Sequence, residues 1–266
     1  MTAPLRPNAA AVAVGSFSPA PGAGSPVGMV LSHALMEIRL NVRNGEQLLL
    51  SVVIPVVLLI GLTKTTVVSI SNDSRIDVVT PGIFALAVMS TAFTGQAIAT
   101  GFERRYGVVK LLGSSPLPRW GLVAAKTIAV LVIEAFQIVL VSLVALALGW
   151  SPKGSAIDAI VLIVVGTAAF SALALLVAGT LRAEATLAVA NAIYILLLLA
   201  GGVIIPLEKL PLGMARVAEF LPSGALGQGL RDVLTQGRPM PWQSFFVLVG
   251  WALAAGIGAH RTFRWE

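Results

Sequence analysis

Long apolar segments alternate along the chain with short polar ones. With their polar ends, six such segments cover residues 47–66, 81–102, 121–148, 157–181, 186–205 and 242–259. A helix rises about 1.5 Å per residue and a hydrocarbon core is about 30 Å thick, so each segment is suited to cross a bilayer. In the first segment only Leu48–Leu62 is continuously apolar, and Pro55 near its middle predicts a kink. The pattern predicts an all-α polytopic membrane protein with six transmembrane helices.

Two segments of different character precede the first span. Residues 1–28 are rich in Pro, Ala, Gly and Ser, which predicts a flexible N-terminal tail. In residues 29–45 a helical stripe of apolar positions runs between polar ones, at Leu31, Leu35, Ile38 and Val42. This stripe predicts a helix lying in the membrane interface, with a cytoplasmic extension of the first span as the alternative. Residues 29–266 then form one six-span domain.

The polar segment between the last two spans is long and interrupted. Met214–Leu221 and Ala225–Leu234 are short helical patterns, separated by Pro222 and two small residues. Neither is long enough to cross a bilayer. We therefore expect two short re-entrant helices that dip into the outer leaflet and return, with protein around their ends.

The composition supports a membrane location. Hydrophobic residues make up 57% of the 266 residues and charged residues only 11%, against about a quarter in an ordinary soluble domain. The mean hydropathy is +0.92. The net charge of +6 does not indicate a nucleic-acid partner, because the basic residues lie between apolar spans, where they set topology and meet lipid headgroups.

The basic residues also indicate an orientation. Nine lie on the side of the loop between spans two and three, close to the membrane ends, and seven lie on the other side. Basic residues near span ends favour the cytoplasm. We therefore expect a multi-pass protein of the cell membrane, with this loop and both termini in the cytoplasm.

Several kinds of chemistry have no residues to support them. The chain has no cysteine, and its two histidines, His33 and His260, lie far apart in the sequence. No G-x-x-x-x-G-K-[ST] phosphate loop occurs, so ATP is not expected to bind this chain by that mechanism. We expect no metal, no cofactor and no catalytic activity in the chain itself.

A few polar residues fall inside the spans and are candidates to line a transport pathway: Gln96, Glu134, Asn191 and Tyr194. Glu134 is the strongest, because an ionisable residue at membrane depth is costly and is commonly functional. It is interpreted either as a proton carrier or as a structural hydrogen-bond acceptor, and the second is favoured because a lone carboxylate makes a poor relay. Lys126, two turns earlier, is expected to snorkel toward the surface.

The most strongly charged stretch of the chain is Glu103–Trp120, between spans two and three. Glu103, Arg104 and Arg105 precede a helical pattern that ends near Gly113. The pattern presents apolar Val108, Leu111 and Leu112 between charges at a water-facing surface. Such a surface is suited to docking a protein partner.

Two blocks of sequence resemble type-2 ABC exporter permeases. Glu103-Arg104-Arg105, Gly107, Leu111-Leu112, Ser115-Pro116-Leu117 and Arg119 resemble that family's E-R-E-x-G-T-x-E-x-L…P-L-x-R stretch. G-G-V-I-I-P-L-E-K-L-P at 201–211, followed by Leu221-Pro222 and Leu230-Arg231, resembles its ending. The resemblance covers about residues 29–266, and drug-efflux permeases of the daunorubicin-resistance type are the most similar subgroup. The sequence departs from the pattern at Arg105, Tyr106 and Val108.

The resemblance implies a six-helix half-transporter that works with a separate ABC ATPase subunit, which would bind ATP and Mg²⁺. It implies that a coupling helix contacts that subunit through Glu103, Arg104, Arg105, Tyr106, Gly107, Leu111 and Leu112. It also implies a second permease protomer, in a homodimer or heterodimer within the lipid. The outer re-entrant helices would close the exit, with Pro206, Pro211, Pro222 and Arg231.

The resulting hypothesis is a permease subunit of an ATP-driven exporter that moves a hydrophobic or amphipathic substrate, such as a drug, an antibiotic or a lipid, out of the cytoplasm. One alternative is an ion-coupled secondary transporter that uses Glu134. Another is a membrane scaffold that transports nothing. A neighbouring gene for an ABC ATPase would favour the first.

Overall fold

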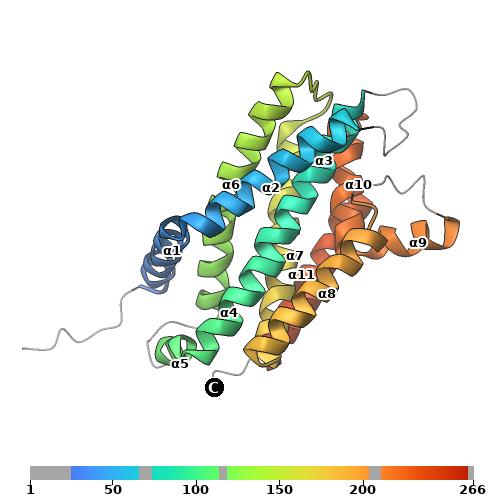
Figure 1. Cartoon of the computed structure of the whole chain (residues 1–266). Coiled ribbons are helices and arrows are strands. Elements are labelled where there is room, and N and C mark those ends of the chain that lie inside the picture. Colours follow the sequence, from blue (N-terminus) through green and yellow to red (C-terminus); the bar gives the residue numbers. More distant parts are fainter. Residues whose placement is uncertain (1–24, 66–73, 114–118, 204–210, 263–266) are drawn as a thin grey trace, which may run out of the picture.

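The computed structural model describes residues 25–65, 74–113, 119–203 and 211–262, which form helices joined by short connections and contain no strand (Figure 1). The helices are α1 (Pro26–Arg43), α2 (Gly45–Lys64), α3 (Arg75–Val88), α4 (Gln96–Arg105), α5 (Val108–Gly113), α6 (Arg119–Ala147), α7 (Ala156–Thr180), α8 (Ala183–Ala200), α9 (Leu212–Phe220), α10 (Pro222–Leu234) and α11 (Trp242–Thr262). A π-helical segment, η1 (Met89–Gly95), joins α3 to α4 in one continuous helix.

Five helices of the described chain are long and apolar enough to cross a membrane. They are Arg75–Arg105, Trp120–Ala147, Ala156–Thr180, Ala183–Ala200 and Trp242–Thr262. The predicted first span corresponds to α2, whose Ser51–Lys64 part is a shorter apolar helix. The all-helical, multi-pass architecture is therefore confirmed, and the sixth crossing stays a prediction.

The helices pack side by side into one bundle with two distinct ends (Figure 1). The end of α4, the short α5 and the start of α8 lie together at the lower end in this view, whereas the start of α3 and the end of α6 lie at the upper end. Helix α1 lies at one edge of the bundle and packs on α6. The charged stretch found in the sequence therefore lies at one end of the bundle.

In the described helices, Pro55 and Pro81 lie in the interior, and a polar side chain from elsewhere in the chain compensates for each. Pro81 in α3 and Pro55 in α2 have no N–H to bond the carbonyl four residues earlier. The Thr235 hydroxyl donates to the carbonyl of Asp77 at 2.6 Å. The Gln137 amide of α6 donates to the carbonyl of Ser51. Helix α3 can therefore begin before Pro81, six residues earlier than the sequence predicted.

Helix α1 begins at Pro26, slightly before the expected interfacial segment 29–45. The Ser25 hydroxyl accepts a hydrogen bond from the Gly28 N–H at 3.1 Å, and Pro26 occupies the first turn, where its missing N–H costs nothing. Val30 and Ala34 pack on Ala125 of α6. The apolar stripe that includes Leu31 and Leu35 remains exposed, as an interfacial helix requires.

The two short helices predicted between the last spans are present as α9 and α10. Helix α10 is buried, and Arg231 on it donates to the carbonyl of Gly202 at 2.9 Å and to that of Val203. A side chain on Gly82 of α3 would collide with Val203, so glycine permits this close approach. Pro222 begins α10 and Pro211 precedes α9, whereas Pro206 lies outside the described residues. Their re-entrant membrane depth stays a prediction.

Candidate functional site

The last turn of α4 and the short α5 form what we term the α4–α5 corner, residues 103–113. Its two arginines bind different helices. Arg104 donates to the carbonyl of Leu181 at 3.0 Å and to that of Ala178, at the end of α7. Arg105 pairs with Glu184 in the first turn of α8, where both side chains are more than half exposed. The two arginines thus fasten the corner to the α7–α8 connection.

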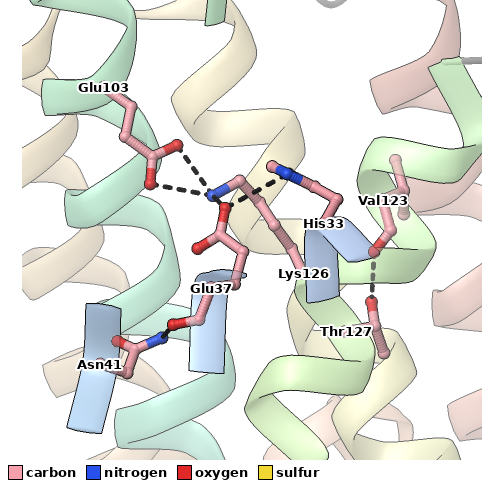
Figure 2. A network of polar contacts seen from close by, with 7 residues as sticks. All are labelled: His33, Glu37, Asn41, Glu103, Val123, Lys126 and Thr127. Carbon is pink, nitrogen blue, oxygen red and sulfur yellow. Dashed lines mark hydrogen bonds and ion pairs between the residues drawn. The ribbon is translucent and has the colours of Figure 1, made fainter. Parts of the chain in front are cut away.

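Glu103 is directed into the protein and joins a buried ion cluster (Figure 2). Its carboxylate lies 2.8 Å from Nζ of Lys126 on α6, and the same ammonium lies 2.7 Å from Oε1 of Glu37 on α1. The Lys126 side chain is only 4% exposed. Lys126 therefore does not snorkel to the surface as expected. It holds the end of α4 and the middle of α1 together.

His33 extends this cluster along α1. Its Nε2 lies 3.4 Å from Oε1 of Glu37, one turn away. Burial lowers the pKa of His33 below its ordinary value of 6.5, and the nearby Lys126 ammonium adds to this, although Glu37 acts in the opposite direction. His33 is therefore neutral at physiological pH, and Lys126 is the cation that faces the two carboxylates.

The outer surface of the α4–α5 corner carries apolar and aromatic side chains between the exposed Arg105 and Lys110. Tyr106 is 74% exposed and Leu111 is 72% exposed, whereas Val109 is fully buried beneath them. Gly107 has a φ of 75°, a conformation that L side chains rarely adopt, so glycine permits the sharp turn between α4 and α5. Leu112, also predicted to contact a partner, is half-buried. The corner thus presents Tyr106 and Leu111 to a possible partner.

A cavity of about 510 Å³ lies between α1, α2, the α3–η1–α4 helix, α6 and α8. Three of the four predicted pathway residues, Gln96, Asn191 and Tyr194, line it together. Glu37, Glu103 and Lys126 line it as well. The cavity and the buried ion cluster are therefore parts of one site.

The residues of α4 that line this cavity include buried polar groups without a hydrogen-bond partner in the described chain. Gln96 is 6% exposed, and neither of its amide atoms has a hydrogen-bond partner among the described residues. The hydroxyl of Thr100, one turn further, is in the same condition within the described part of the chain. Burying such groups unpaired is costly. A wall of this kind is suited to a ligand or water that supplies the missing hydrogen bonds.

Glu134 does not line the cavity. Its carboxylate accepts a hydrogen bond from the hydroxyl of Thr167 on α7, and the residue is 1% exposed. Gln137, nearly one turn on, contacts other elements: its amide donates to the carbonyl of Ser51 on α2 and accepts from the hydroxyl of Thr91. This placement favours the structural interpretation of Glu134 over the proton carrier.

The sequence predicted the exposed residues of the corner but not the contacts that Glu103, Arg104 and Arg105 make with other helices. Glu37 carried no signal beyond its place off the apolar stripe of α1. Lys126 was visible as a lone charge in a span, and such a charge needs a partner. Of the carboxylates, Glu103 lies near the membrane depth of Lys126 in the predicted spans, and Glu37 does so only if α1 packs at that depth.

These features define a class of protein: a multi-pass helical membrane protein with a cavity between its helices and a charged helical corner at one end. The chain belongs to the ABC-2 type transporter family, which matches residues 34–235, from α1 to the end of α10. It is 22% identical over 230 residues to "Putative transport permease YvfS" of Bacillus subtilis (strain 168), covering 83% of this chain and 91% of that protein. It is therefore a transmembrane ABC transporter subunit, which is not itself catalytic, and its family in general implies an ABC ATPase partner.

Proposed function

We propose that this chain is the permease subunit of an ATP-driven exporter and that an ABC ATPase subunit acts on it at the α4–α5 corner. One observation carries the proposal. The corner is bound through Glu103, Arg104 and Arg105 to α1, α6, α7 and α8, while Tyr106 and Leu111 are exposed. A displacement of α5 is therefore passed to several helices at once.

The energy comes from the partner. ATP and Mg²⁺ bind the ATPase subunit, and ATP-dependent closure of that subunit favours one position of α5. Because binding shifts an equilibrium only by its differential affinity, the ATPase must hold the corner more tightly in the outward-open state than in the inward-open state. We expect Arg105, Tyr106 and Leu111 to make these contacts, since Glu103 and Arg104 are turned inward.

The cargo is a hydrophobic or amphipathic compound, such as a drug, an antibiotic or a lipid, moved out of the cytoplasm. The cavity of about 510 Å³ supports a drug-sized ligand, since such sites measure about 300–1,000 Å³. Leu40, Ile54, Leu86, Val130 and Ile133 give it an apolar side. This is in keeping with the daunorubicin-resistance type of drug-efflux permease.

The transporter is proposed to contain a second permease protomer, identical or related, in the cell membrane with both termini in the cytoplasm. Asn191 on α8 is exposed and also lines the cavity, so a second protomer against this face of α8 would lie beside the cavity. Polar side chains at membrane depth face protein or water rather than lipid. Arg231 and Pro222 of α10 and Pro211 before α9 would form the outer gate.

The test compares two exposed aliphatic residues at opposite ends of the bundle. Leu111 on α5 is 72% exposed and Ile157 at the start of α7 is 73% exposed. We expect Leu111→Asp to lower the permease-stimulated ATPase rate at least about fivefold, the effect of losing an interface anchor worth over about 1 kcal/mol. Ile157→Asp should leave the rate unchanged. Equal effects of the two variants, or no stimulation by the wild-type permease, would refute the proposal.

A further inference from the structure

The ion cluster that borders the cavity has unequal charges. Two carboxylates, Glu37 and Glu103, face one ammonium, that of Lys126, at 2.7 and 2.8 Å. No other basic side chain lines the cavity in the described part of the chain. His33 adds no charge, since burial lowers its pKa. One negative charge is therefore in excess at a site where Glu37 and Lys126 are buried and the Glu103 side chain is 23% exposed.

An excess negative charge at a buried site requires a proton or a second cation. The next turns of α4 indicate what kind of cation. Gln96 and Thr100 line the same cavity at helical spacing from Glu103, and their side chains carry buried polar atoms without a hydrogen-bond partner among the described residues. Gln96 is 94% buried, and a ligand in the cavity that reaches its amide would complete its hydrogen bonds. A small hydrated metal ion would not reach from the carboxylates to Gln96 nearly two turns away.

Another part of the cavity lining is apolar. Ile54 and Pro55 of α2, Leu86 of α3 and Val130 and Ile133 of α6 belong to it. A ligand that satisfies both parts of the lining has one positive group, adjacent hydrogen-bonding groups and an apolar body. The cavity volume of about 510 Å³ suits one such molecule but not a polymer chain.

We propose that this cavity binds an amphipathic organic cation, with its positive group beside the carboxylates of Glu37 and Glu103 and its apolar body against α2, α3 and α6. The inference rests on the proposed function, because it names the chemical class of the exported substrate. It adds a charge requirement that the export hypothesis does not contain. Lys126 then acts as a positioning residue that holds the two carboxylates at the cavity wall.

Two ions of the same shape and opposite charge test the proposal without any mutation. Tetraphenylphosphonium is a lipophilic cation and tetraphenylborate is the corresponding anion. Equilibrium dialysis against the purified permease–ATPase complex in detergent measures the binding of each. We expect saturable binding of about one tetraphenylphosphonium per permease chain and at least about tenfold weaker binding of tetraphenylborate, since the contribution of a buried charged contact is of this order.

Three glutamine variants locate the site. Glu37→Gln and Glu103→Gln each leave Lys126 paired with the other carboxylate, and each should weaken cation binding at least about tenfold. Glu134→Gln is the control, because Glu134 is a buried carboxylate that contacts α7 and does not line the cavity. It should bind the cation like the wild type. Where a variant does not fold, the wild-type comparison of the two ions still decides.

Equal binding of the two ions, or cation binding that both cavity variants retain, would overturn the inference. So would preferential binding of tetraphenylborate, which would indicate an anionic or lipid-like ligand. The same complexes are assayed for stimulated ATPase activity. A complex that is stimulated but does not discriminate the ions refutes only this inference. A permease that discriminates them without stimulating the ATPase refutes only the proposed energy source.

Discussion

At the scale of single residues, the most informative contacts are the hydrogen bonds to the carbonyls of Asp77 and Ser51, each four residues before a proline. Proline has no N–H to donate to the carbonyl four residues earlier. A helix at membrane depth therefore tolerates proline only if another group donates a hydrogen bond to that carbonyl. Thr235 supplies that group to Asp77, and Gln137 supplies it to Ser51. Each of these polar side chains crosses to a different helix. They therefore fix the relative depth of α3 and α10, and of α2 and α6.

The contact of Thr235 predicts a stability effect that depends on Pro81. Thr235→Val removes the hydroxyl that donates to the carbonyl of Asp77, and should lower the free energy of unfolding by about 1–3 kcal/mol, since that carbonyl stays buried. In a Pro81→Ala background the new N–H bonds the same carbonyl within α3, so the cost should fall below about 1 kcal/mol. Denaturant unfolding of the four proteins in detergent measures both costs. Equal costs in the two backgrounds would contradict the explanation.

The sequence showed both prolines and predicted a disturbance at Pro55. It also showed Gln137 as a polar residue of a span. It did not show that Gln137 and Pro55 belong together, because that requires the rotation of α6 relative to α2. Polar residues inside spans are visible in a sequence, but their partners depend on packing between helices far apart in the chain.

At the scale of helices, α1 is attached to the end of α4, and the sequence did not predict this attachment. The sequence predicted α1 as an interfacial helix and the corner as a docking surface, without a link between them. Lys126 provides that link by pairing with Glu37 and Glu103 (Figure 2). A movement of the corner therefore acts on α1 directly.

The buried His33 predicts how acidity affects this attachment. Glu37 of α1 and Lys126 of α6 face His33, and Glu103 of α4 completes the group. The pKa of His33 is lowered when α1 is packed and returns to about 6.5 when α1 is released. The stabilisation from neutral His33 is therefore fully present above about pH 6.5 and is lost as the pH falls through the lowered pKa.

Hydrogen exchange of α1 measures this effect. After correction for intrinsic exchange, protection of α1 should be lower at about pH 5.5 than at about pH 7.5. His33→Gln serves as the control, because it cannot titrate and should remove most of the difference. Protection that increases on acidification in the wild-type protein, or the same loss in His33→Gln, would show that His33 does not control the packing of α1.

Helix boundaries were predicted well where apolar runs end at charges, and less well elsewhere. The span 81–102 was expected to begin at Pro81, but its helix extends from Arg75 to Arg105 because Thr235 satisfies Asp77. The π-helical segment η1 was not predicted, since a wider turn leaves no mark in the hydrophobic pattern. It forms part of the cavity wall just before Gln96, and its wider turns change which of the following side chains face the cavity.

At the scale of the whole molecule, the exposed surface of α5 and the cavity are connected through the α4–α5 corner. The corner faces the outside with Tyr106 and Leu111, and its inner residue Glu103 lines the cavity. The sequence predicted the docking surface and the pathway residues from separate stretches. Only the fold shows that Glu103 belongs to both the corner and the cavity. This supports one mechanism in which a push on α5 alters the cavity.

Direct contact between α5 and the ATPase subunit is the central claim, and photo-crosslinking tests it in intact cells. A benzophenone-bearing residue is introduced in place of Leu111, or in place of Ile157 as the equally exposed control at the other end of the bundle. Illumination should join the permease to the ATPase subunit from position 111 and not from position 157. Adducts from both positions, or from position 157 alone, would contradict the account, as would a functional transporter that gives no adduct from position 111.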